Sequence, residues 1–431
     1  MRFGLDLTIA AHAMFLLRGP GALCFRRHNG VSIRNLAPRF LTTKSYAPLR
    51  ILFCGSDDFS IASLKALHEE HVNRPDRIAS IEVACRPGKR FGRGLKKIRE
   101  VPVKAAAEQL SLPIHEIDTF KGWKLPMSHG DPINLIVAVS FGLFVPPRLL
   151  NEARYGGLNV HPSLLPEYIS LPFSPKFSPS LTVRNYSFRG PAPLHHTLLA
   201  GRTRTGVTLQ TLDPVAFDHG VILDQTPSPG LEIPEDCTVP KLLDIVTPKA
   251  ANILVDGIRK GLFVQPLQDV GWRQSGTDEP LLHAGKIQPE DRHIDWANWT
   301  WAEISRRNRV VGPLWSNALV ASGDSTGVQS FQQRRVIFTE IEKAEPTSDP
   351  RTFGAVPGTP FVDGISPFEP RQGKGLYVST QDGSLLRVHQ MKVEGEPNAD
   401  AFTAALKARM VGDRTFSSGA SQYTSFHESL R

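Results

Sequence analysis

The sequence of 431 residues has little cysteine and no cluster of metal-binding side chains. Its four cysteines, Cys24, Cys54, Cys85 and Cys237, share no spacing typical of a metal site and belong to no short disulfide-rich framework. We therefore expect reduced thiols and a chemistry that needs no metal ion.

The chain also lacks a membrane-spanning run at its N-terminus and a dinucleotide-binding motif. The apolar run Ile9–Leu17 has about nine residues, whereas a spanning helix needs roughly twenty. Gly55 stands alone after an apolar strand, where a dinucleotide fingerprint has three glycines. We expect no membrane insertion, and a cofactor with a pyrophosphate is unsupported.

Acidic residues are scarce in the first fifty positions, where Asp6 stands against seven arginines and Lys44. The net charge of the chain is +8, and this tail carries +7 of it. An arginine-rich, acid-poor segment with apolar stretches is typical of a mitochondrial presequence. A secretory signal is the alternative, but His12 interrupts its apolar run and no small-residue cleavage site follows. We expect residues 1–47 to be a disordered presequence that directs the protein to the mitochondrial matrix, with processing near Arg39.

The folded part begins as an open α/β sheet. Leu49–Gly55 reads as an apolar strand ending in a glycine turn, and Ile61–Leu67 follows at helical spacing. Ile78–Ala84 and Leu135–Val139 read as further strands, and Lys241–Ile258 fits a closing helix. This strand-turn-helix start predicts a parallel-rich sheet with a catalytic domain over residues 48–259.

A second domain follows a linker. Residues 260–280 mix glycine, proline and polar side chains without periodicity. Short alternating segments between residues 315 and 391 then predict a small β-barrel over residues 281–412. The serine-rich end, residues 413–431, is expected to be a disordered tail.

A basic segment joins the second predicted strand to the next helix. Seven of the fourteen residues from Arg86 to Arg99 are basic and none is acidic. A charge run is usually a solvated face, but the body of the chain nets only +1, so this concentration favours an anionic partner. We interpret the segment as a flexible loop that meets an anionic partner.

Three side chains suggest acyl transfer to an amine. Asn159 and His161 follow the buried run Leu135–Gly142, and Asp218 comes some sixty residues later in a Phe-Asp-His-Gly loop. An amide and an imidazole N–H can donate to an oxyanion, an imidazole can relay a proton, and a carboxylate can orient it. A lone histidine after a strand is more often structural, but its spacing to Asn159 and Asp218 favours catalysis. His219 beside Asp218 is a weaker competitor for the carboxylate.

Six motifs in order carry a resemblance to a known family: Gly55-x-x-Asp58-Phe59, Gly92-Arg93-Gly94, Asn159-x-His161-Pro-Ser163-Leu-Leu-Pro166, Arg189-Gly-Pro-Ala-Pro193, Asp218-x-Gly220 and Ile294-Asp295-Trp296. Over roughly residues 48 to 412 the chain resembles the methionyl-tRNA formyltransferases. The resemblance implies a Rossmann-like formyltransferase domain followed by an OB-like barrel that holds tRNA.

The resemblance also implies substrates and roles. The formyl donor would be 10-formyltetrahydrofolate and the acceptor initiator Met-tRNA. Apart from the resemblance, we expect by default that the chain acts as a monomer. The catalytic residues would be Asn159, His161 and Asp218. The implied folate contacts are Ser163, Leu164, Leu165 and Pro166. The implied tRNA contacts in the basic loop are Lys89, Arg90, Arg93, Lys96 and Lys97.

Two other functions remain open from the sequence. The same three catalytic side chains serve formyltransferases of small amines, such as glycinamide ribonucleotide or an amino sugar, although the basic loop and second domain disfavour them. The third hypothesis is a catalytically impaired tRNA-binding homologue.

The impaired form is considered because residues 169–188 depart from the family pattern. In the family about two residues join Ser-Leu-Leu-Pro to Arg-Gly-x-Ala-Pro, whereas here twenty further residues lie between Tyr168 and Arg189. They contain three prolines, no acid and no clear periodicity. They are expected to be a loop, either a lineage-specific insert or a retained intron translated in frame. We favour the intron, because an insert at an active-site turn should disturb positioning. Sequencing the mature transcript across this segment decides between them.

Overall fold

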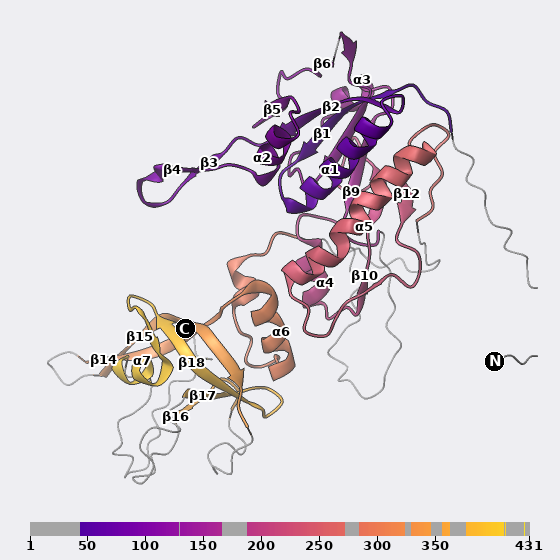
Figure 1. Cartoon of the computed structure of the whole chain (residues 1–431). Coiled ribbons are helices and arrows are strands. Elements are labelled where there is room, and N and C mark those ends of the chain that lie inside the picture. Colours follow the sequence, from indigo (N-terminus) through magenta and orange to yellow (C-terminus); the bar gives the residue numbers. More distant parts are fainter. Residues whose placement is uncertain are drawn as a thin grey trace, which may run out of the picture. The chain divides into compact units, whose positions relative to one another are not determined.

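Figure 1 shows the computed structural model of the chain. The described residues are 44–128, 130–165, 188–271, 284–323, 329–345, 356–362 and 376–408, with Met410 and Phe426. The predicted presequence as far as residue 43, Pro166, and the atypical segment up to residue 187 lie outside them. So does most of the predicted C-terminal tail.

A seven-stranded sheet forms the first half of the described chain, in the order β12-β11-β9-β8-β1-β2-β5. Its strands are β1 (Leu49–Gly55), β2 (Ile78–Cys85), β5 (Ile114–Glu116), β8 (Leu135–Val139), β9 (Gly157–His161), β11 (Thr208–Thr211) and β12 (Ile222–Gln225). The pairs from β5 through β9 are parallel, and β11 is antiparallel to both of its neighbours. The predicted parallel-rich α/β sheet is confirmed.

The central strands are apolar because both faces of the sheet are covered. Every residue of β8 is buried, as are all but one of β1. Five α-helices belong to this half: α1 (Asp58–Asn73), α2 (Pro102–Gln109), α3 (Pro147–Glu152), α4 (Pro193–Leu199) and α5 (Val239–Lys260). Helix α1 packs beside α5 (Figure 1), where Arg259 Nη2 lies 2.6 Å from Glu70 Oε2.

Capping residues fix where these helices begin and end. The Asp57 side chain accepts a hydrogen bond from Ser60 N at the start of α1, and Thr238 does the same for α5. Helix α5 ends at Gly261, which has a left-handed backbone with φ 65°. Three small two-stranded ladders complete this half: β3 (Lys89–Phe91) with β4 (Lys97–Arg99), β6 (Met127–Ser128) with β7 (Asp131–Pro132), and β10 (Arg204–Thr205) with β13 (Leu231–Glu232). A 3-10 turn, η1 (Arg93–Leu95), lies between β3 and β4.

The C-terminal half carries a six-stranded antiparallel sheet in the order β14-β15-β18-β17-β16, with β19 paired to β18. The elements are η2 (Pro289–Arg292), α6 (Trp301–Val311), β14 (Leu314–Gly323), β15 (Gln329–Lys343), β16 (Pro360–Val362), β17 (Leu376–Ser379), β18 (Leu385–Val393), β19 (Asn398–Asp400) and α7 (Ala401–Lys407). The predicted small β domain is confirmed as an antiparallel sheet.

One residue of the tail that was predicted to be disordered, Phe426, packs against the core of the C-terminal sheet. This ring is buried and stacks on Trp296, with centroids 6.1 Å apart, and it meets Phe338 edge-on at 5.4 Å. Ser316 Oγ donates to Phe426 O over 2.9 Å and accepts from Trp296 Nε1 over 3.0 Å. An aromatic side chain in a serine-rich segment is held because the core of the sheet offers an apolar site.

Within the part of the chain that is described, no helix combines the length and apolar character needed to cross a bilayer.

Candidate active site

The amide and imidazole predicted for catalysis lie on a strand of the sheet. Asn159 and His161 are alternate residues of β9, so their side chains share one face. The sequence interpretation placed them beyond a strand, whereas the motif itself forms the strand next to β8. In the antiparallel ladder to β11, Gln210 pairs with Asn159 and Thr208 pairs with His161.

Asp218 reaches the same face from the loop between β11 and β12. Its backbone is left-handed, with φ 58°, a conformation that aspartate tolerates better than most residues. Two residues on, a Cβ at Gly220 would lie 1.7 Å from the carbonyl oxygen of Thr211. The Asp-x-Gly motif thus forms a tight turn that carries the carboxylate to β9.

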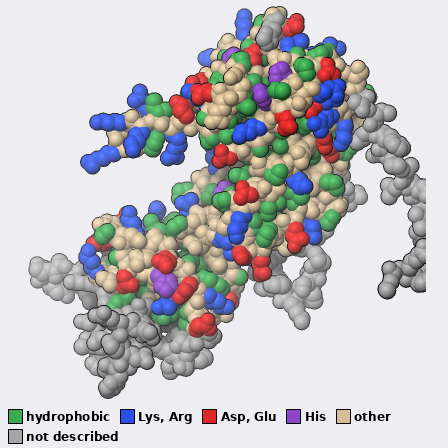
Figure 2. Space-filling model, in the orientation of Figure 1, with side chains coloured by type: hydrophobic (Ala, Val, Ile, Leu, Met, Phe, Trp, Pro, Cys, Tyr) green, Lys and Arg blue, Asp and Glu red, His purple; other side chains and the backbone are tan. Residues whose placement is uncertain are grey.

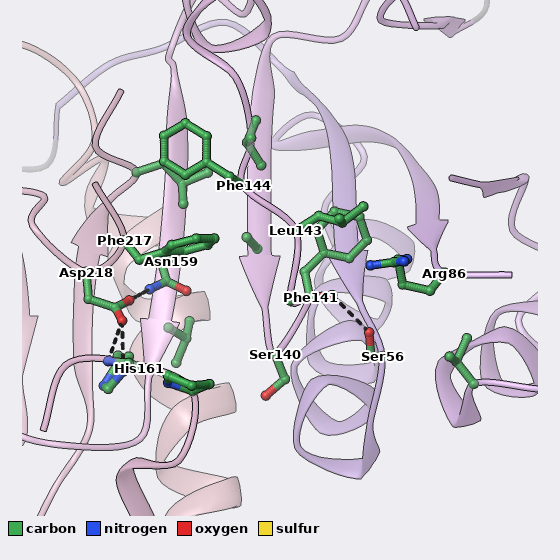
Figure 3. Close-up of a pocket in the computed structure, with 18 of the residues that line it drawn as sticks. Ser56, Arg86, Ser140, Phe141, Leu143, Phe144, Asn159, His161, Phe217 and Asp218 are labelled. Atoms are coloured by element: carbon green, nitrogen blue, oxygen red, sulfur yellow. Dashed lines mark hydrogen bonds and ion pairs between the residues drawn. The ribbon is translucent and has the colours of Figure 1, made fainter. Parts of the chain in front are cut away.

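The Asp218 carboxylate is surrounded by donors (Figure 3). Its Oδ1 accepts from Asn159 Nδ2 over 2.9 Å and from Gln210 Nε2 over 3.3 Å. Its Oδ2 accepts from the Gly190 backbone N–H over 3.0 Å and lies 3.4 Å from His161 Nε2. Asn159, His161 and Asp218 are therefore brought together, as the sequence predicted.

These donors determine the charge of the carboxylate. Burial alone raises the pKa of Asp218, but His161 and the hydrogen bonds from Gly190 and Asn159 outweigh it and lower that pKa to about 2. Asp218 is therefore an anion near neutral pH.

His161 is held by its other ring nitrogen. Its Nδ1 lies 2.9 Å from the buried Ser163 Oγ. Its Nε2 is buried and attracted by Asp218, but within the described residues it makes no hydrogen bond of good geometry. The ring is thus oriented through Nδ1, and Nε2 remains available to exchange a proton.

A cavity of about 960 Å³ opens beside these three residues. Strand β1 lies between β8 and β2 in the sheet, so the chain reverses its direction of winding between β1 and β8. Ligands of open α/β sheets bind at such a switch point, beyond the carboxyl ends of the strands. Ser56 after β1 and Ser140 after β8 line the cavity there.

The loop after β8 is a part of the site that the sequence did not predict. Ser140 and Gly142 have left-handed backbones, with φ 49° and 74°, and the residues from Ser140 to Val145 all line the cavity. Phe144 meets Phe217 edge-on at 5.2 Å, which gives the cavity an aromatic wall. The available signal was the position of Ser-Phe-Gly directly after a fully buried strand.

The segment predicted to bind folate is buried beneath the site. Ser163, Leu164 and Leu165 are at most 5% exposed and are not among the residues that line the cavity, whereas Pro162 is. Thr208 Oγ1 donates to Ser163 O over 2.6 Å and accepts from Leu165 N over 3.1 Å. In this structure the segment supports β9 and His161, and Pro166 lies outside the described residues.

The basic segment is a hairpin, so the predicted flexible loop is wrong in this respect. Strands β3 and β4 pair Lys89 with Arg99 and Phe91 with Lys97, and Arg99 lies over the Phe91 ring at 4.6 Å. Lys89, Arg90, Arg93, Lys96 and Lys97 are all exposed. Figure 2 shows basic side chains gathered along this hairpin. The ladder and the cation–π contact order the segment, and Lys89 and Phe91 also line the cavity.

Two other described histidines near the site, His219 and His196, make contacts outside the cluster. His219 Nδ1 lies 2.6 Å from Phe217 O, so this ring does not compete for Asp218. His196 Nε2 lies 2.9 Å from Gly285 O, which is a packing contact. Among the described residues no group of three or more His, Cys, Asp or Glu side chains could hold a metal ion.

Comparison with known proteins places this site in a family context. Residues 49–257 match the formyl transferase family. The mitochondrial methionyl-tRNA formyltransferase of Saccharomyces cerevisiae is 30% identical over 429 residues, which cover 88% of this chain and 97% of that protein. The human mitochondrial methionyl-tRNA formyltransferase is 32% identical over 62% of this chain and 58% of its own length. A solved sugar 3N-formyl transferase aligns with a TM-score of 0.43 at 14% identity, over 81% of this chain and 99% of that one.

Proposed function

Because this chain belongs to the methionyl-tRNA formyltransferase family, we propose that its cavity transfers the formyl group of 10-formyltetrahydrofolate to the α-amine of methionine on initiator Met-tRNA. The chain is an enzyme of one-carbon transfer. The observation that carries the proposal is the cluster of Asn159, His161 and Asp218 at the edge of a cavity of about 960 Å³.

The cluster supplies the groups that formyl transfer requires. A neutral amine attacks the formyl carbon, a carbon–nitrogen bond forms, and the carbonyl oxygen becomes negatively charged. Asn159 Nδ2 has two hydrogens, of which one is used by Asp218 and the other can stabilise that oxygen. Such a donor is typically worth about 2.7 to 4 kcal/mol of barrier.

His161 and Asp218 can carry out the two proton transfers that the reaction requires. The attacking nitrogen must lose a proton, and the nitrogen of the folate must gain one when its bond to the formyl carbon breaks. His161 Nε2, which is free of other hydrogen bonds among the described groups, can accept the first and return the second. The Asp218 anion at 3.4 Å stabilises the charged imidazole between these steps.

The cavity suits a folate. Its volume of about 960 Å³ lies within the usual range for a small-molecule site, and its Phe144–Phe217 wall offers edge-on contacts to flat rings. We propose that the pteridine side of the donor occupies this part. The implied folate segment from Ser163 to Pro166 would then act by supporting the site from below.

Two surfaces are proposed for the tRNA. The β3–β4 hairpin offers Lys89, Arg90, Arg93, Lys96 and Lys97 to phosphates, with Lys89 also at the cavity. Residues 281–412, with the predicted barrel-like sheet, would hold the body of the tRNA beyond the linker 260–280. The formyl donor, the tRNA and a single protein chain complete the proposed assembly.

The mitochondrial relatives support a mitochondrial location, and we propose the matrix as the compartment. The basic tail would then be a cleaved presequence. The small-amine alternative is not favoured, because the curated relatives of the chain are methionyl-tRNA formyltransferases.

The test is a formylation assay with the purified chain, Met-tRNA and 10-formyltetrahydrofolate, run beside Asn159→Ala and His161→Ala. We expect transfer by the unaltered chain and a loss of at least a hundredfold in both variants. Activity that survives both substitutions would sink the mechanism. Transfer to a free small amine with none to Met-tRNA would establish the alternative, and tRNA binding without transfer would indicate an impaired homologue.

A further inference from the structure

Gln210 is a buried amide at the centre of the site that has no role in the proposed chemistry. It lies on β11 directly opposite Asn159 on β9, so the two amide side chains are cross-strand neighbours. Gln210 lines the cavity, although only 1% of the residue is exposed. The site therefore holds a second amide beside the predicted catalytic one.

The orientation of the Gln210 amide follows from its partner. Nε2 lies 3.3 Å from Asp218 Oδ1, and an ionised carboxylate can only accept hydrogen bonds. The nitrogen must therefore face Asp218, and Oε1 is left pointing elsewhere. Within the described part of the chain this buried oxygen has no hydrogen-bond partner. Native proteins seldom leave such an acceptor unsatisfied, so a ligand that brings a donor is the natural partner.

Few donors can reach this position in the reaction proposed above. Gln210 lies next to Asn159 and Asp218, where the formyl carbon and the amine must meet. The formyl-bearing nitrogen of 10-formyltetrahydrofolate is a tertiary amide and has no N–H. The attacking amine carries N–H groups both before and during its attack on the formyl carbon.

We propose that Gln210 is a substrate-binding residue whose Oε1 accepts a hydrogen bond from the attacking primary amine, which it places between Asn159 and His161. This inference rests on the proposed function. The hydrogen bond uses one N–H of the amine, so the nitrogen lone pair can be directed at the formyl carbon. As that nitrogen becomes positively charged during attack, the bond to Oε1 strengthens, until His161 takes the proton. The interaction therefore acts on both binding and the transition state.

The test compares two ligands on the full-length chain. One is initiator tRNA carrying methionine, and the other is the same tRNA carrying the des-amino analogue of methionine. Gln210→Met keeps the length of the side chain and removes Oε1. We expect it to weaken binding of Met-tRNA about fivefold to tenfold and to change binding of the des-amino tRNA less than twofold. The dissociation constant of tetrahydrofolate should also stay within twofold.

A matched control separates this effect from a general disturbance of the sheet. Gln225→Met changes a buried glutamine on β12 whose Nε2 lies 2.9 Å from Thr208 Oγ1 and which does not line the cavity. It should affect the two tRNA ligands equally. Gln210→Met also removes Nε2, so the Asp218 anion has one donor fewer. Such an anion would attract an amine more strongly. A selective weakening of Met-tRNA binding must therefore come from the loss of Oε1.

The outcomes decide the proposal. A selective loss for Met-tRNA in Gln210→Met supports it. Equal weakening of both ligands, or no weakening of either, overturns it. Failure of the proposed function gives a different result, because the unaltered chain would then bind Met-tRNA without formylating it, or would formylate a different amine. In the second case Gln210→Met is tested with that amine.

Discussion

Asn159 Nδ2 donates a 2.9 Å hydrogen bond to Asp218 Oδ1, although 59 positions separate the two residues in the chain. Strand β9 supplies the amide, and the turn after β11 supplies the carboxylate. The bond fixes which way the amide faces, since the nitrogen must lie toward an anion. The protein therefore fixes the direction of the second Nδ2 hydrogen of Asn159 before any substrate binds.

The first prediction concerns this pre-oriented donor. Asn159→Ala removes the hydrogen that would stabilise the oxyanion, and we expect kcat to fall about a hundredfold to a thousandfold. KM for Met-tRNA should change little, because the interaction is made only in the transition state. Single-turnover formylation measures the chemical step directly. A loss confined to KM would contradict the assigned role.

A second prediction separates two roles for Ser163. The resemblance implies a folate contact, whereas the structure places the hydroxyl 2.9 Å from His161 Nδ1, with the residue fully buried. If Ser163 positions the imidazole, Ser163→Ala should lower kcat about tenfold and leave KM for the formyl donor unchanged. Initial rates across donor concentrations measure both. A rise in KM at constant kcat would instead support direct folate contact.

The strands and side chains of the site show how much of the structure could be predicted from the sequence. The apolar runs that became β1, β2 and β8 could be read directly, since buried parallel strands are continuous stretches of apolar residues. Asn159 and His161 could be paired by their spacing in the motif, although the strand that carries them, β9, was not predicted. Gln210 could not be found in this way, because its approach to Asp218 depends on the β9–β11 register, which is a long-range pairing. The loop after β8 was missed because its role depends on strand order.

In the β3–β4 hairpin and at Phe426, the composition predicted flexibility where the structure shows ordered contacts. Glycine and charge in the basic segment predicted flexibility, but a ladder from Lys89 to Arg99 and a cation–π contact to Phe91 order it. The serine-rich end predicted disorder, but Phe426 finds an apolar site against Trp296. In the hairpin a local ladder and cation–π contact, and at Phe426 a long-range aromatic contact, outweigh the local composition.

A third prediction follows from the low pKa of Asp218. That pKa falls from an ordinary 3.8 to about 2 on folding, so the carboxylate stabilises the native state fully above about pH 4. The contribution, about 2 kcal/mol, is lost as pH falls toward 2. Asp218→Asn removes this group's titration. Urea unfolding of both proteins from pH 6 to pH 2 should show the stability advantage of the unaltered chain shrinking with acid. A constant difference in unfolding free energy would refute the assignment.

A fourth prediction tests the turn that carries Asp218. A Cβ at Gly220 would lie 1.7 Å from the Thr211 carbonyl oxygen, which is backbone and cannot swing away. Gly220→Ala should therefore destabilise the protein by about 3 kcal/mol and displace the carboxylate from Asn159. Thermal unfolding and the formylation rate measure the two effects.

The control for Gly220 is another glycine. Gly122 has a left-handed backbone with φ 72°, and a Cβ at this position would have no neighbouring atom within 4 Å. Gly122→Ala should cost only about 1 to 2 kcal/mol, from backbone strain, with formylation intact. Equal effects of the two substitutions would mean that the close approach at Thr211 has no special importance.

The last prediction concerns the charge of the β3–β4 hairpin. Lys89, Arg90, Arg93, Lys96 and Lys97 are exposed, and each phosphate contact made by such a side chain releases bound counterions. Replacing all five by glutamine should lower the slope of log Kd for tRNA against log salt by up to about five, with weaker binding at low salt. Glutamine at Lys121 and Lys124, which are exposed outside the hairpin, is the matched control and should leave the slope unchanged. If both sets of substitutions reduce the slope in proportion to the charge removed, the tRNA senses the net charge of the protein and not the hairpin. A reduction confined to the hairpin would show that this ordered arm, which also contributes Lys89 to the cavity wall, contacts the phosphates of the tRNA.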